Sequence, residues 1–358
     1  MRLLGVCLGL WSVLGLRGWA EEVRYTFDAS TEGWMSLDPE ARVQQVTGTE
    51  SVKEGVGALE FRYTLRAGAL PVVGTLGLRP PQGFRGIDLW VRTSQDTTLA
   101  LVVSEGDGST YNFPFFVFAQ RWTRVQARLE EFLLGDNQVD ENQRLDAEQV
   151  ETLGLLDVAF FLAQLGQQPL PQPQRILWLD AVRLTDQALP SRCPERILPD
   201  GRAILWLGPS VEGPLFWVPV MGQVRMQAEK EQPVLHWRYR VTPQQPLSLL
   251  LFPAPPSLQG ARGFRLRVRC PHTTVLGLAL EEKGTKGTYG AQIQVQGSPH
   301  WQEFTLPWEA FLPDPNKPDP DGKLDLAQVG VIFLADAAGG LQAFGEHELW
   351  IAEVAVER

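Results

Sequence analysis

The sequence predicts an all-β fold that consists of two tandem antiparallel β-sandwich domains. Short segments alternate apolar and polar residues, as in residues 59–65, where odd positions are apolar and even positions polar. This period of two is typical of a half-buried strand. Gly, Pro and Asp turns separate the segments, and long amphipathic helical patterns are missing. Many short strands joined by such turns indicate a sandwich or a barrel.

An internal duplication indicates that there are two such domains. Residues 83–92 read GFRGIDLWVR, and residues 260–269 read GARGFRLRVR, which is 177 positions later (260 − 83). Downstream, LDAEQV at 145–150 returns as LDLAQV at 324–329, and LWLDAV at 177–182 returns as LWIAEV at 349–354. A period of this length is too long for a solenoid and corresponds to two whole domains.

The chain is therefore divided into four parts. Residues 1–20 have one Arg, an apolar run and small residues at 18 and 20, which predicts a cleaved signal peptide and a secreted protein, extracellular or periplasmic. The apolar run is shorter than a membrane span needs, so no span is expected after cleavage. Residues 21–186 form the first predicted domain, 187–202 a linker, and 203–358 a divergent second copy.

In chain order, the first copy shows strand patterns at 23–27, 43–46 and 59–65, and then at 87–92, 98–104, 111–118, 122–129 and 176–184. One segment, 146–153, is expected to be briefly helical with Asp146 as N-cap. In the second copy, residues 235–239 align with 59–63, and Trp301 aligns with Trp122.

Charge and cysteine usage narrow the classes of partner. The net charge of the 358 residues is −10, which argues against nucleic acid and anionic membranes as partners. Beyond residue 20 there are two cysteines, Cys193 and Cys270. They could form one bridge in an oxidising compartment, but two thiols are no disulfide framework.

Several stretches together resemble a known family. They are FDASTEGW at 27–34, KEGVG at 53–57, the strand from Trp122 toward Phe132, LDAEQV and LWLDAVRL. With these, residues 23–186 resemble a carbohydrate-binding module of the galactose-binding-like jelly-roll superfamily, and residues 203–358 resemble it less closely. The resemblance implies a jelly-roll sandwich that binds a polysaccharide or another glycan. The superfamily also contains protein-binding and structural members.

Comparison of the two copies separates core from surface positions, because successive side chains of a strand leave opposite faces. Ile87, Leu89 and Val91 match Phe264, Leu266 and Val268 as core residues. The outward positions of the first copy carry surplus aromatic residues, which can stack on sugar rings while polar neighbours bond the hydroxyls. The predicted ligand-binding residues are Trp90, Phe116, Phe118, Arg62, Asp88, Arg92, Arg124 and Gln126, beside Glu60. Alternatively, these aromatic side chains are buried against the second domain, a loop or another chain.

The second copy presents cations at the matching outward positions. These are Arg238, Arg240, Arg265, Arg267 and Arg269, beside His236. Guanidinium groups match carboxylate and sulfate geometry, so the cluster could bind uronic or sulfated sugars. It could equally contact the acidic first domain or be an ordinary solvated face.

One loop suggests calcium as a structural cofactor; no other cofactor is expected. DPNKPDPDGKLD at 314–325 offers the oxygen ligands Asp314, Asn316, Asp319 and Asp321, and Asp325 follows. The loop lacks the spacing and terminal Glu of an EF-hand, and turn formation explains its composition equally well.

No catalytic motif is present. HExxH, GxSxG, P-loop and dinucleotide patterns are missing, so the sequence predicts no enzyme. The leading hypothesis is a secreted, non-catalytic carbohydrate-binding protein that uses a sheet face of the first domain. The alternative is a structural or protein-interaction module of the cell envelope, with a protein partner at the cell surface and no sugar ligand.

Overall fold

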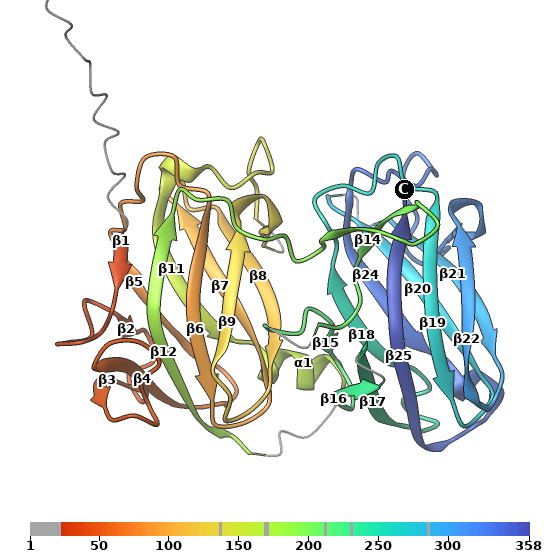
Figure 1. Cartoon of the computed structure of the whole chain (residues 1–358), viewed down its shortest axis with the longest axis horizontal. Coiled ribbons are helices and arrows are strands. Elements are labelled where there is room, and N and C mark those ends of the chain that lie inside the picture. Colours follow the sequence, from red (N-terminus) through yellow and green to blue (C-terminus); the bar gives the residue numbers. More distant parts are fainter. Residues whose placement is uncertain (1–22, 136–137, 168–171, 211–212, 230–231, 285–286) are drawn as a thin grey trace, which may run out of the picture.

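The chain folds into two β-sandwiches that lie side by side, as the sequence predicts (Figure 1). The computed structural model describes residues 23–135, 138–167, 172–210, 213–229, 232–284 and 287–358. The predicted signal peptide, residues 1–20, lies outside the described residues. Within the described part of the chain, no helix is long and apolar enough to cross a membrane.

Sheets A and B form the first sandwich. Sheet A has the order β3 (Arg42–Thr47), β4 (Gly57–Thr64), β12 (Gln174–Thr185), β6 (Gly86–Thr93) and β9 (Thr123–Arg128), with β1 (Val23–Tyr25) on β12. Sheet B has the order β10 (Leu133–Leu134), β8 (Thr110–Val117), β7 (Thr97–Glu105), β11 (Val150–Asp157), β5 (Val72–Leu76) and β2 (Met35–Ser36). All pairings are antiparallel, so alternate residues of each strand enter the core.

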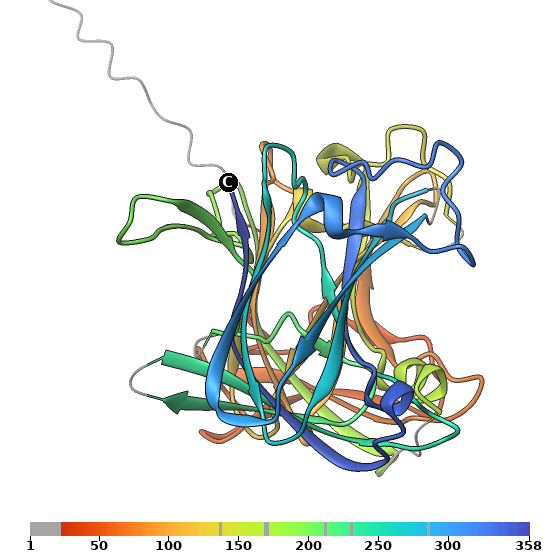
Figure 2. The same cartoon turned by 90° about the vertical axis from the view of Figure 1, so that its right-hand side faces the viewer.

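Sheets C and D form the second sandwich, which Figure 2 shows as two separate layers. Sheet C contains β13 (Glu195–Ile197), β14 (Ala203–Trp206), β25 (Gly345–Glu357), β17 (Gln232–Val241) and β16 (Gln223–Glu229), with β19 (Gly263–Cys270) on β25 and β22 (Ser298–Pro307) on β19. Sheet D has the order β15 (Val218–Pro219), β18 (Ser248–Pro253), β24 (Val329–Asp336), β20 (Thr274–Glu282), β21 (Thr288–Val295) and β23 (Leu312–Pro313).

Short helical turns recur at equivalent places in the two sandwiches. η1 (Leu129–Glu131) follows β9, and η3 (Trp308–Ala310) follows β22. The other turns are η2 (Ala147–Gln149) and η4 (Ala338–Leu341), and the described α-helix is α1 (Ala159–Leu165). The helical prediction for 146–153 was wrong in extent, because only η2 forms and β11 begins at Val150. Pairing of β11 with β5 and β7 places the second half of this segment in sheet B rather than in a helix.

The cores confirm the assignment of inward positions in the duplicated stretch. Ile87, Leu89 and Val91 are buried in the first core, and Phe264, Leu266 and Val268 are buried in the second. Equivalent residues therefore specify the same sandwich twice, by burying the same face of the same strand.

A buried carboxylate with the same partners lies in each sandwich. Asp157 accepts hydrogen bonds from the Tyr63 hydroxyl at 2.6 Å and the Thr97 hydroxyl at 2.9 Å. Asp336 accepts the matching bonds from Tyr239 at 2.5 Å and Thr274 at 2.9 Å. Burial raises the pKa of Asp157, and these donors compensate for the lost solvation of its charged form. In each copy the network fixes the end of a central strand.

The segment from Leu215 to Pro219 joins the two sandwiches. Its Leu215 exchanges two backbone hydrogen bonds with Phe116 at the edge of sheet B, of 2.7 and 2.9 Å. Three residues later, β15 pairs with β18 at the edge of sheet D. Between them, Phe216 packs against both cores. One strap thus bonds the edges of two sheets from different sandwiches.

Candidate functional site

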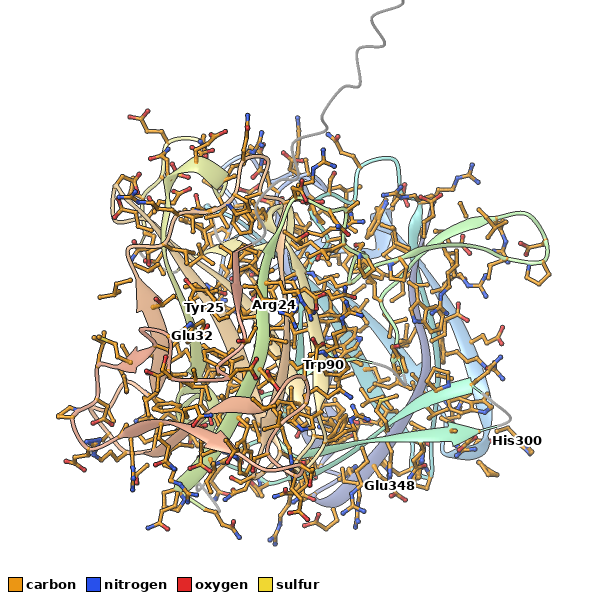
Figure 3. All side chains as sticks on the ribbon, turned by 60° about the vertical axis from the view of Figure 1, so that its left-hand side comes forward. Arg24, Tyr25, Glu32, Trp90, His300 and Glu348 are labelled. Atoms are coloured by element: carbon orange, nitrogen blue, oxygen red, sulfur yellow. The ribbon has the colours of Figure 1, made fainter. Side chains whose placement is uncertain are left out.

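The predicted aromatic face is divided between two sheets. Trp90 lies on the outer face of sheet A, within a crowded layer of polar side chains (Figure 3). Phe116 and Phe118 lie on the outer side of sheet B instead, and Phe116 is only 6% exposed. It belongs to the core cluster of the second sandwich, and Phe118 packs against that cluster. The expectation of one shared binding face for the three was wrong, because β6 and β8 are in opposite sheets.

The polar side chains on the outer face of sheet A largely bond one another. Arg62 bonds both carboxylate oxygens of Glu60, at 2.7 and 3.0 Å. Arg124 bonds both oxygens of Asp88, at 3.0 and 2.6 Å. Gln126 donates to the same Asp88 at 3.5 Å. In these bidentate pairs the guanidinium donors and the carboxylate acceptors bond each other, so they are not available to a sugar hydroxyl.

The tryptophan rings of sheet A have cations over them. The Lys53 ammonium lies 4.2 Å from the Trp90 ring, and the Trp90 indole donates to Glu54 at 3.0 Å. Next to it, the Arg92 guanidinium lies 5.1 Å from the ring of Trp178, a residue that the sequence interpretation placed only in a strand. A cation over a ring is a favourable contact that a stacking sugar would have to displace.

The cationic cluster of the second copy is mostly paired with carboxylates. Arg265 lies 3.1 Å from Glu353, and Arg267 lies 3.6 Å from Glu303. Arg269 lies 2.5 Å from Glu229. The expectation of one five-arginine anion patch is therefore corrected, because neighbouring strands supply carboxylates beside these three guanidinium groups.

An aromatic ladder that the sequence interpretation missed lies on the same face of sheet C. Arg269 lies between Trp301 and Trp350, at 4.8 and 5.1 Å from their rings. His236 stacks on Trp350 with 4.4 Å between centroids, and its Nε2 lies 3.0 Å from Glu348. The signal was available in the sequence, since Trp350 aligns with Trp178 in the repeated LWLDAV and LWIAEV stretches.

The predicted calcium ligands are bonded to protein donors instead. Asp314 accepts bonds from the backbone N–H of Asn316 at 2.8 Å, and Asp321 accepts one from Lys323 at 2.9 Å. The Tyr289 hydroxyl donates to Asp319 at 2.9 Å. Among the residues that the structure describes, no group of three His, Cys, Asp or Glu side chains is arranged to hold a metal ion. The acidic loop is therefore organised by turns and by a tyrosine.

The two cysteines are free thiols, so they form no bridge. Burial raises the pKa of Cys193 to about 12 and that of Cys270 to about 11. A buried thiol with a raised pKa is less reactive, because the thiolate is the nucleophilic form.

Two concave features lie between the sandwiches. A cavity of about 600 Å³ is lined by outward residues of sheet B, including Asn112 and Pro114, and by outward residues of sheet D, including Leu251 and Val331. A second cavity, of about 720 Å³, lies beside it, and both are lined by Thr98 and by Leu162 of α1. Together they are called the interdomain cleft below.

The interdomain cleft combines apolar walls with polar groups at its edges. The polar lining of the first cavity is Asn112, Gln138, Asp140, Gln143, Glu281, Glu282 and Lys283. Burial lowers the pKa of Lys283. The carboxylates are already engaged: Tyr111 donates to Asp140, Lys317 lies 2.9 Å from Glu281, and the N–H of Asp325 donates to Glu282 at 2.6 Å.

The buried Asp157 network positions this cleft. Asp157 accepts a hydrogen bond from the N–H of Ala159 at 2.9 Å, at the first residue of α1. The backbone N–H of Val158 donates to the carbonyl of Thr98 at 3.0 Å. The helix that lines both cavities is therefore bonded directly to the strand that lines both cavities.

Comparison with models of protein families gives no match, and comparison with curated protein sequences gives none either. Solved structures of similar fold include the family 11 carbohydrate-binding module of Clostridium thermocellum, 14% identical, covering 42% of this chain and 94% of that one with a TM-score of 0.34. They also include the tandem family 22 modules of Paenibacillus barcinonensis Xyn10C, 13% identical, covering 94% and 98% with a TM-score of 0.29.

A family 29 carbohydrate-binding module solved with cellohexaose is 11% identical and has a TM-score of 0.28.

Proposed function

We propose that the protein is a non-catalytic carbohydrate-binding protein whose ligand, a polysaccharide chain, lies in the interdomain cleft. The observation that carries the proposal is the pair of adjoining cavities of about 600 and 720 Å³, lined by the outer faces of both sandwiches. Ligand sites are usually clefts of about 300 to 1,000 Å³ with apolar walls and a few polar groups. Domain interfaces are a preferred location for them.

The lining suits a sugar in chemical terms. Leu251 and Val331 offer apolar surface to the C–H faces of pyranose rings. Asn112 and Gln138 offer both donors and acceptors to the hydroxyl groups. The proposal moves the site from the outer face of sheet A to that of sheet B, because the polar groups of sheet A are occupied by one another.

The engaged carboxylates support binding rather than hydrolysis. A glycoside hydrolase needs one carboxyl group as an acid and another as a base or nucleophile. Asp140, Glu281 and Glu282 each have a hydrogen-bond or ion-pair partner in the surrounding loops. They act as anchors of those loops in the proposed binding site.

Two of the predicted aromatic residues are buried against the second domain, which was the alternative to a sugar-stacking role for them. Phe116 and Phe118 have the role of interface residues, with the second sandwich of the same chain as their partner. Their rings lie 5.2 Å apart in an edge-to-face arrangement. They stabilise the tandem arrangement and so help to form the cleft.

The test is glycan binding by the folded two-domain protein, surveyed on a glycan array and quantified by calorimetry. Asn112→Ala should weaken binding about tenfold, which corresponds to about 1.4 kcal/mol, because it removes a group that bonds hydroxyls. Trp90→Ala is the matched control on sheet A and should leave affinity unchanged. Affinity lost with Trp90→Ala and kept with Asn112→Ala would place the site on sheet A instead. No binding to any glycan would overturn the proposed function.

A further inference from the structure

The second cavity of the interdomain cleft has an excess of arginine. Among the residues that the structure describes, it is lined by Arg175, Arg225, Arg238 and Arg240 and by two carboxylates, Asp96 and Glu346. The protein as a whole has a net charge of −10. A cationic lining on an acidic protein is a local charge pattern that favours an anionic ligand.

The ion pairs show which of these arginines have no carboxylate partner. Within the described part of the chain, Arg225 and Arg238 have no carboxylate within 4.0 Å, in contrast to Arg265 and Arg267 of the same sheet. Arg240 lies 3.8 Å from Glu346, and both side chains are more than 70% exposed. An exposed pair at that distance contributes little.

Arg175 forms part of the wall of the second cavity but adds little net charge to it. It is 5% exposed, and its guanidinium donates to the backbone carbonyls of Gln172 and Asp96, both at 3.1 Å. Its charge lies close to that of the buried Asp157, whose pKa it lowers against the larger effect of burial. The unbalanced positive charge therefore belongs to Arg225 and Arg238.

The place of these arginines in the fold is fixed by strand pairing. Arg238 is paired with Gln223 across β16 and β17, and Arg225 is two residues further along β16. The close turn before β16 contains Gly222, where a Cβ atom would lie 2.3 Å from the carbonyl oxygen of Arg238. Glycine thus allows the chain to pass tightly from the strap into the arginine-bearing hairpin.

We propose that this end of the cleft binds the anionic group of an acidic polysaccharide, a uronate carboxylate or a sulfate ester. The inference rests on the proposed function and specifies its ligand class. Guanidinium groups bond both oxyanions in a two-pronged geometry that an ammonium group does not match. The sugar chain then continues along the first cavity, and one of its acidic groups lies at the second.

The experiment compares polymers that share a backbone and differ in charge. Polygalacturonate is compared with its methyl ester, and dextran sulfate with dextran, each by calorimetry against the folded two-domain protein. The first pair tests carboxylate and the second tests sulfate. The wild-type protein should bind at least one acidic polymer about tenfold more tightly than its neutral counterpart, and the difference should shrink with added salt because exposed charges are screened.

The variant for this test is Arg225→Gln with Arg238→Gln. It should bind the acidic polymer about tenfold more weakly and the neutral polymer unchanged. The control, Arg42→Gln with Arg79→Gln, removes the same charge from exposed positions outside the cleft lining and should match wild type. Circular dichroism and melting temperature verify that each variant folds.

The outcomes separate the two proposals. Equal binding of acidic and neutral polymers, or equal loss in the two double variants, would overturn the acidic ligand and leave the proposed function standing. Acidic binding that neither Asn112→Ala nor the Arg225 and Arg238 variant weakens would be surface adsorption and would overturn both. If the protein binds none of the four polymers and no glycan of the array, the proposed function itself is overturned.

Discussion

The residue beside the buried aspartate network differs between the two sandwiches. Arg175 and His347 occupy equivalent places, opposite Tyr63 in β4 and opposite Tyr239 in β17. Each tyrosine bonds the buried aspartate of its sandwich. The first sandwich therefore has a guanidinium group beside this network, and the second has an imidazole ring.

This difference predicts a pH dependence of stability that arises in the second sandwich. His347 Nδ1 lies 2.6 Å from His272 Nε2, so at least one of the two rings is unprotonated at the contact. Burial, and then the neighbouring His347, lower the pKa of His272. Below the ordinary histidine pKa of about 6.5 the unfolded chain binds more protons than the folded one, so stability falls as the pH falls.

The free energy of unfolding should be measured from pH 7.5 to pH 5.5. Wild type should lose stability over this range, and His272→Gln should lose less, since it removes the group with the lowered pKa. His300→Gln is the control, because His300 is exposed, and it should follow wild type. Identical pH profiles for wild type and His272→Gln would refute the assignment.

At the scale of elements, the strap from Leu215 to Pro219 determines what the sandwiches can do together. It pairs with β8 of sheet B through Leu215 and with β18 of sheet D through β15. Phe113 and Phe216 meet edge to face at 5.7 Å, which joins the two cores. Backbone pairing at both ends and an aromatic contact between them support a fixed geometry for the interdomain cleft.

Phe116 is the residue through which this element can be tested. Its side chain comes from the first sandwich but is buried in the core cluster of the second. Phe116→Ala should lower the free energy of unfolding by about 3 to 5 kcal/mol, as is usual for truncation of a buried phenylalanine. Phe161→Ala is the control, since Phe161 of α1 is 46% exposed and should cost far less. Equal costs in denaturant titrations would contradict the burial.

At the scale of the whole molecule, the loops at equivalent positions of the two sandwiches are anchored by the same kinds of hydrogen bond. Tyr111 donates to Asp140 in the first sandwich, and Tyr289 donates to Asp319 in the second. Glu282 accepts a bond from the N–H of Asp325, and Glu105 accepts the equivalent bond in the first copy. Protein donors therefore satisfy carboxylates that calcium would otherwise bind.

The melting temperature should then be the same with excess calcium and with excess chelator. A ligand that binds only the folded state raises stability in proportion to the logarithm of its concentration over its dissociation constant. Scanning calorimetry at millimolar calcium and millimolar chelator measures the difference, with magnesium as the ionic control. A rise of several degrees that is specific to calcium would show that a site forms in this protein.

The sequence alone determined the two sandwiches and the inward faces of their strands. Alternation in residues 59–65 and 87–92 is enough for this, because burial of one face of a strand imposes a period of two. The duplicated stretches 83–92 and 260–269 indicated that there are two sandwiches. A local pattern misled only where the signal was short, as at 146–153.

Only the tertiary structure decided which outward residues share a surface. Alternation says that Trp90 and Phe116 both point outward, but it does not say that β6 and β8 belong to opposite sheets. It likewise could not show that Glu353 and Glu303 lie beside Arg265 and Arg267, or that Phe116 is buried in the other sandwich. Such pairings join residues far apart in the chain, and packing rather than local propensity selects them. The interdomain cleft is a product of that packing.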